Sequence, residues 1–117
     1  MIRHIAMWKL KEENKEENAK ILKRQLETLV LIIPEITALE VGLNITSASG
    51  SYDVVLNSVF NSVEDLEKYQ KNPNHLAVAE FCDSIRLERT VVDYSFQDES
   101  GDTGMKPYQT WTDTENK

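Results

Sequence analysis

The fold is decided at the stretch Tyr69-Gln70-Lys71-Asn72-Pro73-Asn74-His75-Leu76, where one short helical pattern ends and a second begins. Proline disfavours a helical conformation in the residue before it and is well tolerated in the first turn of a helix. We expect Asn74 to cap the second helix, because its side chain can accept a hydrogen bond from an otherwise unpaired amide. The junction therefore fixes the backbone at the point where His75 is displayed.

The other histidine of the chain, His4, lies in an alternating stretch at residues 2–10 that predicts a strand. Every second residue of a strand points to the same side. The residues that share a side with His4 are Ile2, Ala6, Trp8 and Leu10. Whether His4 and His75 meet over a shared cavity is the functional question that the sequence raises.

The remaining pattern predicts a long helix, two short helical segments and three more strands. A charge-dense run from residue 11 opens the long helix, and Pro34 ends it. Its apolar residues recur at steps of three and four: Ala19, Leu22, Leu26, Leu29, Val30 and Ile33. Strands are expected at about 37–43, 52–60 and 90–96, with a capping box at 62–65 and the helix after Pro73 ending near Arg89. The order is β-α-β-β-α-β, with the second α unit split in two, which indicates an α+β domain.

Both faces of the predicted sheet carry apolar residues. The first strand has Ile5 and Met7 on the side away from His4, and the third strand has Val55 and Val59 opposite Val54. Helices cover one face of such a sheet, and the other face of a monomer should be polar. A symmetric copy is the commonest cover, so we predict a homodimer packed through the sheet faces.

Composition limits the range of partners. The chain has 117 residues, which suits one domain, and a net charge of −7, which argues against a nucleic-acid or anionic-membrane surface. We expect no membrane span and no signal peptide, because residues 1–10 form a strand and no apolar run is long enough. The single cysteine, Cys82, cannot form an intramolecular disulfide, which suggests a cytoplasmic protein and a buried, inert thiol.

Residues 97–117 differ from the rest of the chain and are expected to form an acidic polar extension to a domain of residues 1–96. Within this extension, Met105, Tyr108 and Trp111 step by three. We predict that these side chains dock on the domain or on a neighbour.

The sequence contains no recognisable metal or cofactor motif. Two histidines and one cysteine, widely spaced, match no zinc pattern, and the segment 49–51 lacks the spacing of a phosphate loop. Asp53 and Asp93 both fall in predicted strands, where a paired-carboxylate site is conceivable but a strand-edge or interface role is commoner. We therefore expect no metal and no cofactor.

Three residues could carry chemistry. A neutral His75 imidazole could remove a proton next to a carbonyl, Tyr69 could hydrogen-bond the substrate or the developing enolate, and His4 could orient it. Each also has a structural interpretation. His75 would then be a helix-start residue paired with a backbone group or water, His4 a hydrogen-bonded core histidine, and Tyr69 a core aromatic.

Several short segments, in their order and spacing, resemble one known family. They are Ile2-Arg3-His4-Ile5, Ile33-Pro34-Glu35-Ile36, Val41-Gly42-Leu43-Asn44, Gly50-Ser51-Tyr52-Asp53, the segment from Tyr69 to His75, and Val91-Val92-Asp93-Tyr94. Together they resemble the stress-responsive A/B barrel domain family, called Dabb, over residues 1 to about 96. The resemblance implies a ferredoxin-like protomer that pairs into a dimeric α/β barrel.

The resemblance also implies a site. In a plant polyketide cyclase of this family, two histidines and two tyrosines surround a cavity between sheet and helices. Its histidines match His4 and His75, one tyrosine matches Tyr69, and the other falls at Leu26 in this sequence. The expected cavity wall is Trp8, Leu26, Tyr52 and Phe81.

Two functions follow from these patterns. The first is a homodimer of stress-response type that binds a small apolar or aromatic molecule. The alternative is a cofactor-independent enzyme, polyketide cyclase-like or small monooxygenase-like, with His75 as general base beside Tyr69 and His4. The feature that discriminates between these two functions is a closed, polar-tipped cavity that contains both histidines, as opposed to side chains that simply fill the space.

Overall fold

The computed structural model describes residues 1–97, so the predicted docking of Met105, Tyr108 and Trp111 lies outside the described residues. The elements are β1 (Ile2–Leu10), α1 (Lys15–Ile32), β2 (Ile36–Leu43), β3 (Val54–Phe60), α2 (Val63–Lys71), α3 (Pro73–Ile85) and β4 (Arg86–Ser95). This confirms the predicted β-α-β-β-α-β order and the split second α unit.

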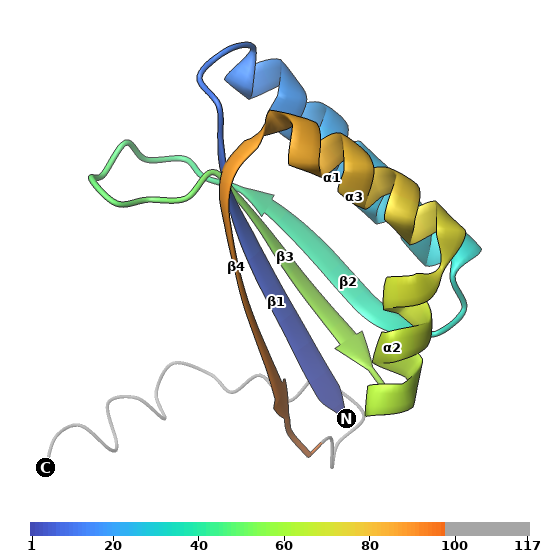
Figure 1. Ribbon diagram of the computed structural model, residues 1–117. Helices are drawn as coiled ribbons and strands as arrows, with labels where there is room; N and C mark the ends of the chain where they lie inside the picture. Colours follow the sequence, from blue (N-terminus) through green and yellow to red (C-terminus); the bar gives the residue numbers. More distant parts are fainter. Residues whose placement is uncertain (98–117) are drawn as a thin grey trace, which may run out of the picture.

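The strands form one antiparallel sheet in the order β2-β3-β1-β4, and the helices lie together on one of its faces (Figure 1). This is the α+β, ferredoxin-like fold. β1 lies in the interior of the sheet, between β3 and β4. His4 pairs with Ser58 on β3 and with Asp93 on β4, which places these residues side by side.

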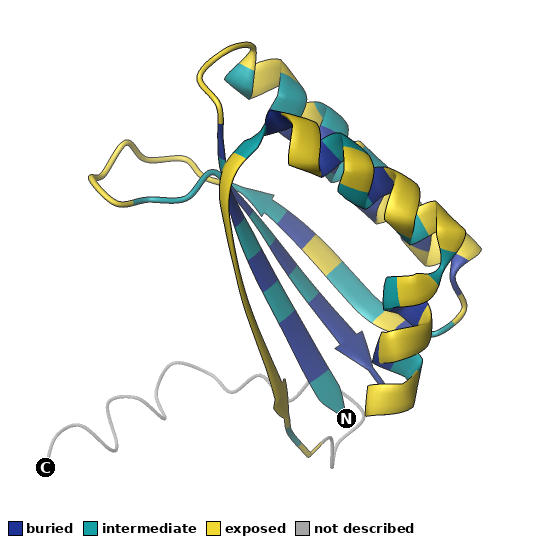
Figure 2. Ribbon diagram, in the orientation of Figure 1, coloured by how far each residue is buried: buried dark blue, intermediate teal, exposed yellow. Residues whose placement is uncertain are grey.

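The core lies between the sheet and the helices, as Figure 2 shows by burial. On β1 the buried residues Ala6, Trp8 and Leu10 alternate with half-buried ones, as period two predicts. On α1 the buried residues are Ala19, Leu22, Leu26 and Leu29. Val30 was predicted to belong to this stripe, but it is 41% exposed, because it lies about 100° around the helix from Leu29.

The junction between α2 and α3 has a different cap from the predicted one. The cap is Asn72, whose side-chain oxygen accepts a hydrogen bond of 2.8 Å from the Asn74 amide, so the assignment of the cap to Asn74 was wrong. Pro73 takes the first helical position, where its missing N–H costs nothing. At the start of α2, Ser62 Oγ accepts a hydrogen bond of 3.1 Å from the Asp65 amide, which is the N-cap half of the predicted capping box.

The predicted extension of α3 to Arg89 was also wrong. The helix ends at Ile85, whose carbonyl accepts a hydrogen bond of 2.8 Å from the amide of Lys11, just after β1. Arg86 then pairs with Leu10, so the chain enters β4 without a connecting loop. Pairing with β1 satisfies the backbone groups of these residues in place of another helical turn, and it overrides the local helical pattern.

The face of the sheet away from the helices carries apolar side chains. Ile5, Met7 and Val55 are half-buried there, and Val92 and Tyr94 are exposed. None of the helices in residues 1–97 covers this face, and β4 is exposed along almost its whole length (Figures 1 and 2). None of those helices is long and apolar enough to cross a membrane.

Candidate functional site

A cavity of about 230 Å³ lies between the sheet and the helices. Its apolar wall comes from β1, β3, α1 and α3 and consists of Trp8, Leu22, Leu26, Leu56, Val78 and Ala79. Its polar residues come from β1, α2, α3 and β4, and they are His4, Tyr69, His75, Asp83, Arg86 and Arg89. The three residues that the sequence singled out for chemistry therefore line one cavity.

Tyr69, in the last turn of α2, is the central side chain of this polar group. Its ring centroid lies 4.3 Å from that of His75 and 6.3 Å from that of His4. The side chain is 0% exposed, and its hydroxyl has no hydrogen-bond partner within the described residues. Burial raises the pKa of Tyr69, against a smaller opposite effect of the Arg89 charge, so the hydroxyl stays protonated. It is therefore a hydrogen-bond donor available to a ligand.

His4 is held by a carboxylate on the neighbouring strand. Its Nδ1 lies 2.5 Å from Oδ1 of Asp93, the residue directly opposite it in the pairing of β1 with β4. A carboxylate accepts hydrogen bonds, so Nδ1 carries the proton and donates it. In the neutral ring, Nε2 then has a free lone pair, and the carboxylate fixes the orientation of the ring.

His75 is held in a comparable way by the backbone. Its Nδ1 donates to the carbonyl oxygen of Gln70 at 3.2 Å, which leaves Nε2 as an acceptor. Burial lowers the pKa of His75, the hydrogen bond to Gln70 opposes this, and the charges of His4 and Arg89 lower it further. The imidazole is thus neutral at pH 7 and can accept a proton at Nε2.

Comparison with known proteins gives the family. Residues 2–96 match the family described as the stress responsive A/B barrel domain, Dabb. The chain belongs to the Dabb family. No curated protein matches it.

Solved structures agree with this assignment. A dimeric protein of unknown function with a ferredoxin-like fold from Bacteroides fragilis is 29% identical, with a TM-score of 0.75 over 81% of this chain and 95% of that chain. A Dabb family protein from Mesorhizobium loti is 20% identical, with a TM-score of 0.68 over 83% and 97%. A hydroxynitrile lyase from Passiflora edulis is 19% identical, with a TM-score of 0.73 over 83% and 94%. The last two likenesses show the fold alone.

Two of the four predicted wall residues do not line the cavity of this Dabb domain. Trp8 and Leu26 do, but Tyr52 precedes β3 and borders a second, more open hollow with Met7 and Val55 on the other face of the sheet. Its hydroxyl donates to Glu88 at 2.9 Å. The strand was predicted to begin at residue 52, but it begins only at Val54, so Tyr52 lies before it.

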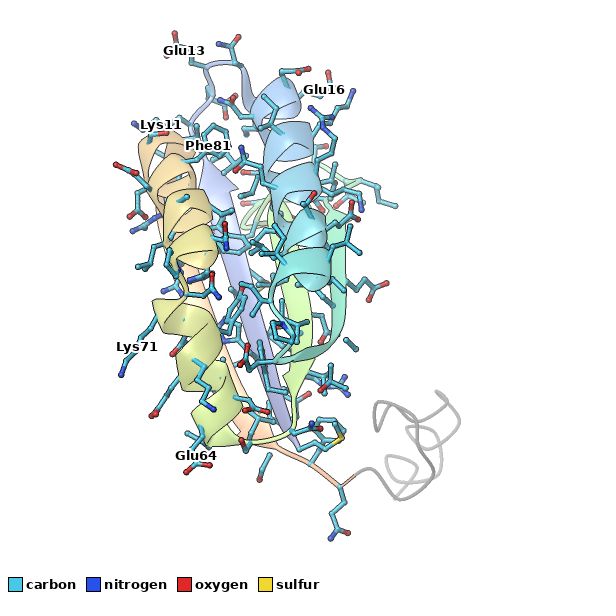
Figure 3. All side chains as sticks on the ribbon, turned by 90° about the vertical axis from the view of Figure 1, so that its right-hand side faces the viewer. Lys11, Glu13, Glu16, Glu64, Lys71 and Phe81 are labelled. Atoms are coloured by element: carbon cyan, nitrogen blue, oxygen red, sulfur yellow. The ribbon has the colours of Figure 1, made fainter. Side chains whose placement is uncertain are left out.

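Phe81 is the other predicted wall residue that lies elsewhere. It lies in the second half of α3, toward the same end of the molecule as Lys11 (Figure 3), and its partly buried ring packs against the core. The adjacent Cys82 takes the cavity-facing position instead. Burial raises the pKa of the Cys82 thiol to about 12, so the thiol is un-ionised at neutral pH.

Two polar residues near the cavity of this Dabb domain were not predicted to belong to the site. Asp93 contacts His4, and the paired-carboxylate interpretation fails because Asp53 lies near the other end of β1, where it accepts the Leu10 amide. Arg89 was missed because it was placed at a helix end. The pairing of β1 with an antiparallel β4 is the signal that could have found both. Residues 1–97 contain no cluster of three or more side chains able to hold a metal ion.

Proposed function

We propose that this Dabb protein binds a small, mainly apolar or aromatic molecule that carries a hydroxyl or carbonyl group, in the cavity between sheet and helices. The observation that supports this most is Tyr69, which lines the cavity and whose fully buried hydroxyl has no hydrogen-bond partner in residues 1–97. Leaving such a group unpaired costs about 1–3 kcal/mol, and a ligand that accepts its hydrogen bond would recover part of this.

The other polar groups complement this donor. The Nε2 lone pair of His75 can accept a hydrogen bond from a ligand hydroxyl, because its Nδ1 already donates to the Gln70 carbonyl. The Nδ1 of His4 donates to Asp93, so its Nε2 is the ring atom left for a ligand. The aliphatic and indole side chains of the wall suit an apolar body. A volume of about 230 Å³ lies below the usual range for drug-sized ligands, so we expect a molecule of roughly one ring with short substituents.

The proposal can be tested with 4-ethylphenol as a neutral probe, followed by the shifts of backbone and imidazole signals in NMR spectra. We expect a dissociation constant on the order of 1 mM or below. Ala79 lines the cavity, whereas Ala77 is exposed on the same helix. Ala79→Phe should abolish binding and Ala77→Phe should not. Equal binding by the two variants would place the probe elsewhere and remove support for the proposal.

We also propose that the protein acts as a homodimer packed through the sheet faces, which gives a dimeric α/β barrel. The exposed Val92 and the half-buried Ile5 and Met7 on the uncovered face support this, as does the 29% identical protein described as dimeric. Sedimentation should show a dimer that Val92→Glu dissociates. The control Leu31→Glu, at a residue 86% exposed on α1, should leave the dimer intact. A wild-type monomer at micromolar concentration would contradict the proposal.

Catalysis is a second candidate function, and the observation that favours it is that His4, Tyr69 and His75 line one cavity, where Asp93 also fixes the orientation of the His4 ring. In this function His75 Nε2 removes a proton next to a ligand carbonyl, Tyr69 donates to the resulting enolate oxygen, and His4 positions the substrate. This is the first step of a cyclase-like ring closure, and it needs no cofactor.

The proton-removal step can be followed without the natural substrate. The methyl protons of 4-hydroxyacetophenone should exchange with D₂O in the presence of the protein, and NMR measures the rate. We expect exchange at least tenfold faster with the wild type than with His75→Gln, which keeps the size of the side chain but removes the base. Equal rates would exclude His75 as a general base and leave the binding function standing.

A further inference from the structure

We propose that the ligand is an anion, a small apolar or aromatic carboxylate whose charge pairs with Arg89 at the exposed end of the cavity. This inference rests on the proposed binding function and adds the chemical class of the ligand. It starts from a contrast between the protein and its cavity. The chain carries a net charge of −7, yet the cavity is lined by two arginines and one aspartate.

The charges around the cavity leave one arginine uncompensated. Arg86 Nε pairs with Asp83 Oδ1 at 2.8 Å, and the nearby Asp93 accepts from His4. Arg89 forms no ion pair within the part of the chain that the structure describes. Its positive charge nevertheless acts on the cavity, because it lowers the pKa of both Tyr69 and His75. A guanidinium held beside a cavity without a carboxylate partner favours an anionic ligand.

The polar residues of the cavity differ in depth, with Arg89 at the exposed end and Tyr69 and His4 at the buried end. Arg89 is exposed on β4 and lies directly opposite Trp8, which is 6% exposed, so both are on the helix side of the sheet. Tyr69 and His4, by contrast, are 0% and 3% exposed. A ligand would therefore place its hydroxyl or carbonyl group at the buried end, its apolar body against Trp8, and its carboxylate at Arg89. Arginine presents two parallel N–H groups that match the two oxygens of a carboxylate.

A pair of probes of nearly equal shape isolates the charge: 4-hydroxyphenylacetate and 4-hydroxyphenylacetamide. Both would be titrated into the full chain in low-salt buffer, because salt screens a partly exposed charge. We expect the wild type to bind the carboxylate about tenfold more tightly than the amide. Arg89→Gln should lose the preference and bind both probes with about equal affinity. The matched control Arg24→Gln removes the same charge from an exposed site on α1 and should keep the tenfold preference.

The outcomes separate this inference from the function on which it rests. Equal affinity of the wild type for both probes would overturn the anionic ligand and leave the binding function intact. A preference that persists in Arg89→Gln would overturn the role of Arg89. Binding of neither probe, and of no 4-ethylphenol, would overturn the proposed function and this inference together. Arg89 is exposed on an edge strand, so its variant should fold, and the dispersion of its NMR spectrum verifies this.

Discussion

Replacing Tyr69 by phenylalanine should make the protein more stable and its cavity less able to bind. The side chain is 0% exposed, and its ring packs 5.0 Å from that of Phe60 and 4.3 Å from that of His75, measured between centroids. Phenylalanine keeps these ring contacts. It removes only the hydroxyl, which has no hydrogen-bond partner among residues 1–97.

The magnitude follows from the cost of an unpaired polar group. A buried hydroxyl without a partner costs about 1–3 kcal/mol, because water no longer solvates it. Tyr69 lines a cavity, so we take the lower end of this range and expect Tyr69→Phe to raise the free energy of unfolding by about 1 kcal/mol. For a domain of this size, that corresponds to a rise in Tm of about 4 °C.

Urea unfolding at one fixed protein concentration measures this change, since the stability of a dimer depends on concentration. Tyr52→Phe is the control, because its exposed hydroxyl donates to Glu88 at 2.9 Å and its loss should change stability by no more than about 0.5 kcal/mol. A Tyr69→Phe variant less stable than the wild type, with an unchanged denaturant slope, would refute the reasoning. It would mean that the hydroxyl is satisfied in the folded protein and is not held for a ligand.

Three further predictions concern titration, reactivity and backbone conformation. Burial lowers the pKa of His75 below the unfolded value of about 6.5, so the unfolded state binds this proton first and the free energy of unfolding falls as pH drops below about 6.5. In urea unfolding, His75→Gln should therefore lose less stability than the wild type between pH 7.5 and 5.5, and equal losses would contradict this. Cys82, with its pKa raised to about 12, should react with a thiol reagent at pH 8 only after urea unfolds the protein, and rapid labelling of the native chain would disprove its burial. Gly50 has φ of +84°, so Gly50→Ala should cost about 1 kcal/mol in urea unfolding while Ser51→Ala costs little, and equal costs would exclude a left-handed requirement at Gly50.

Local periodicity was enough to predict most of the fold. Alternation predicts the buried side of β1, and apolar spacing of three and four predicts the buried side of α1. In the structure, the predicted side of each element faces the core. The end of α3 could not be predicted in this way. It depends on a hydrogen bond from Lys11 and on the pairing of Leu10 with Arg86, which join parts of the chain about 75 residues apart.

The residues of the candidate site also differ in whether a pattern within one element predicts them. His4, Tyr69 and His75 each stand out within their own element, and the structure brings them to one cavity. The position of Arg89 at the cavity and the contact of Asp93 with His4 depend on the pairing of β4 with β1, so a pattern within β4 alone does not predict them. The cavity wall was predicted from residue type, which identifies apolar bulk but not the direction in which a side chain leaves its helix or loop.

The break between α2 and α3 explains how half of the site is assembled. Tyr69 and His75 are six positions apart, and in one continuous helix they would lie about 120° apart around the axis, on different faces of the helix. The extended conformation of Asn72, at φ −65° and ψ 132°, is the one that a following proline favours, and it restarts the helix in a new direction. The two rings then lie 4.3 Å apart, and His75 Nδ1 reaches back to the carbonyl of Gln70 in the helix just ended. Because the break itself supplies the hydrogen bond that fixes the His75 tautomer, a continuous helix would lose both the contact with Tyr69 and the free Nε2 that either proposed function needs.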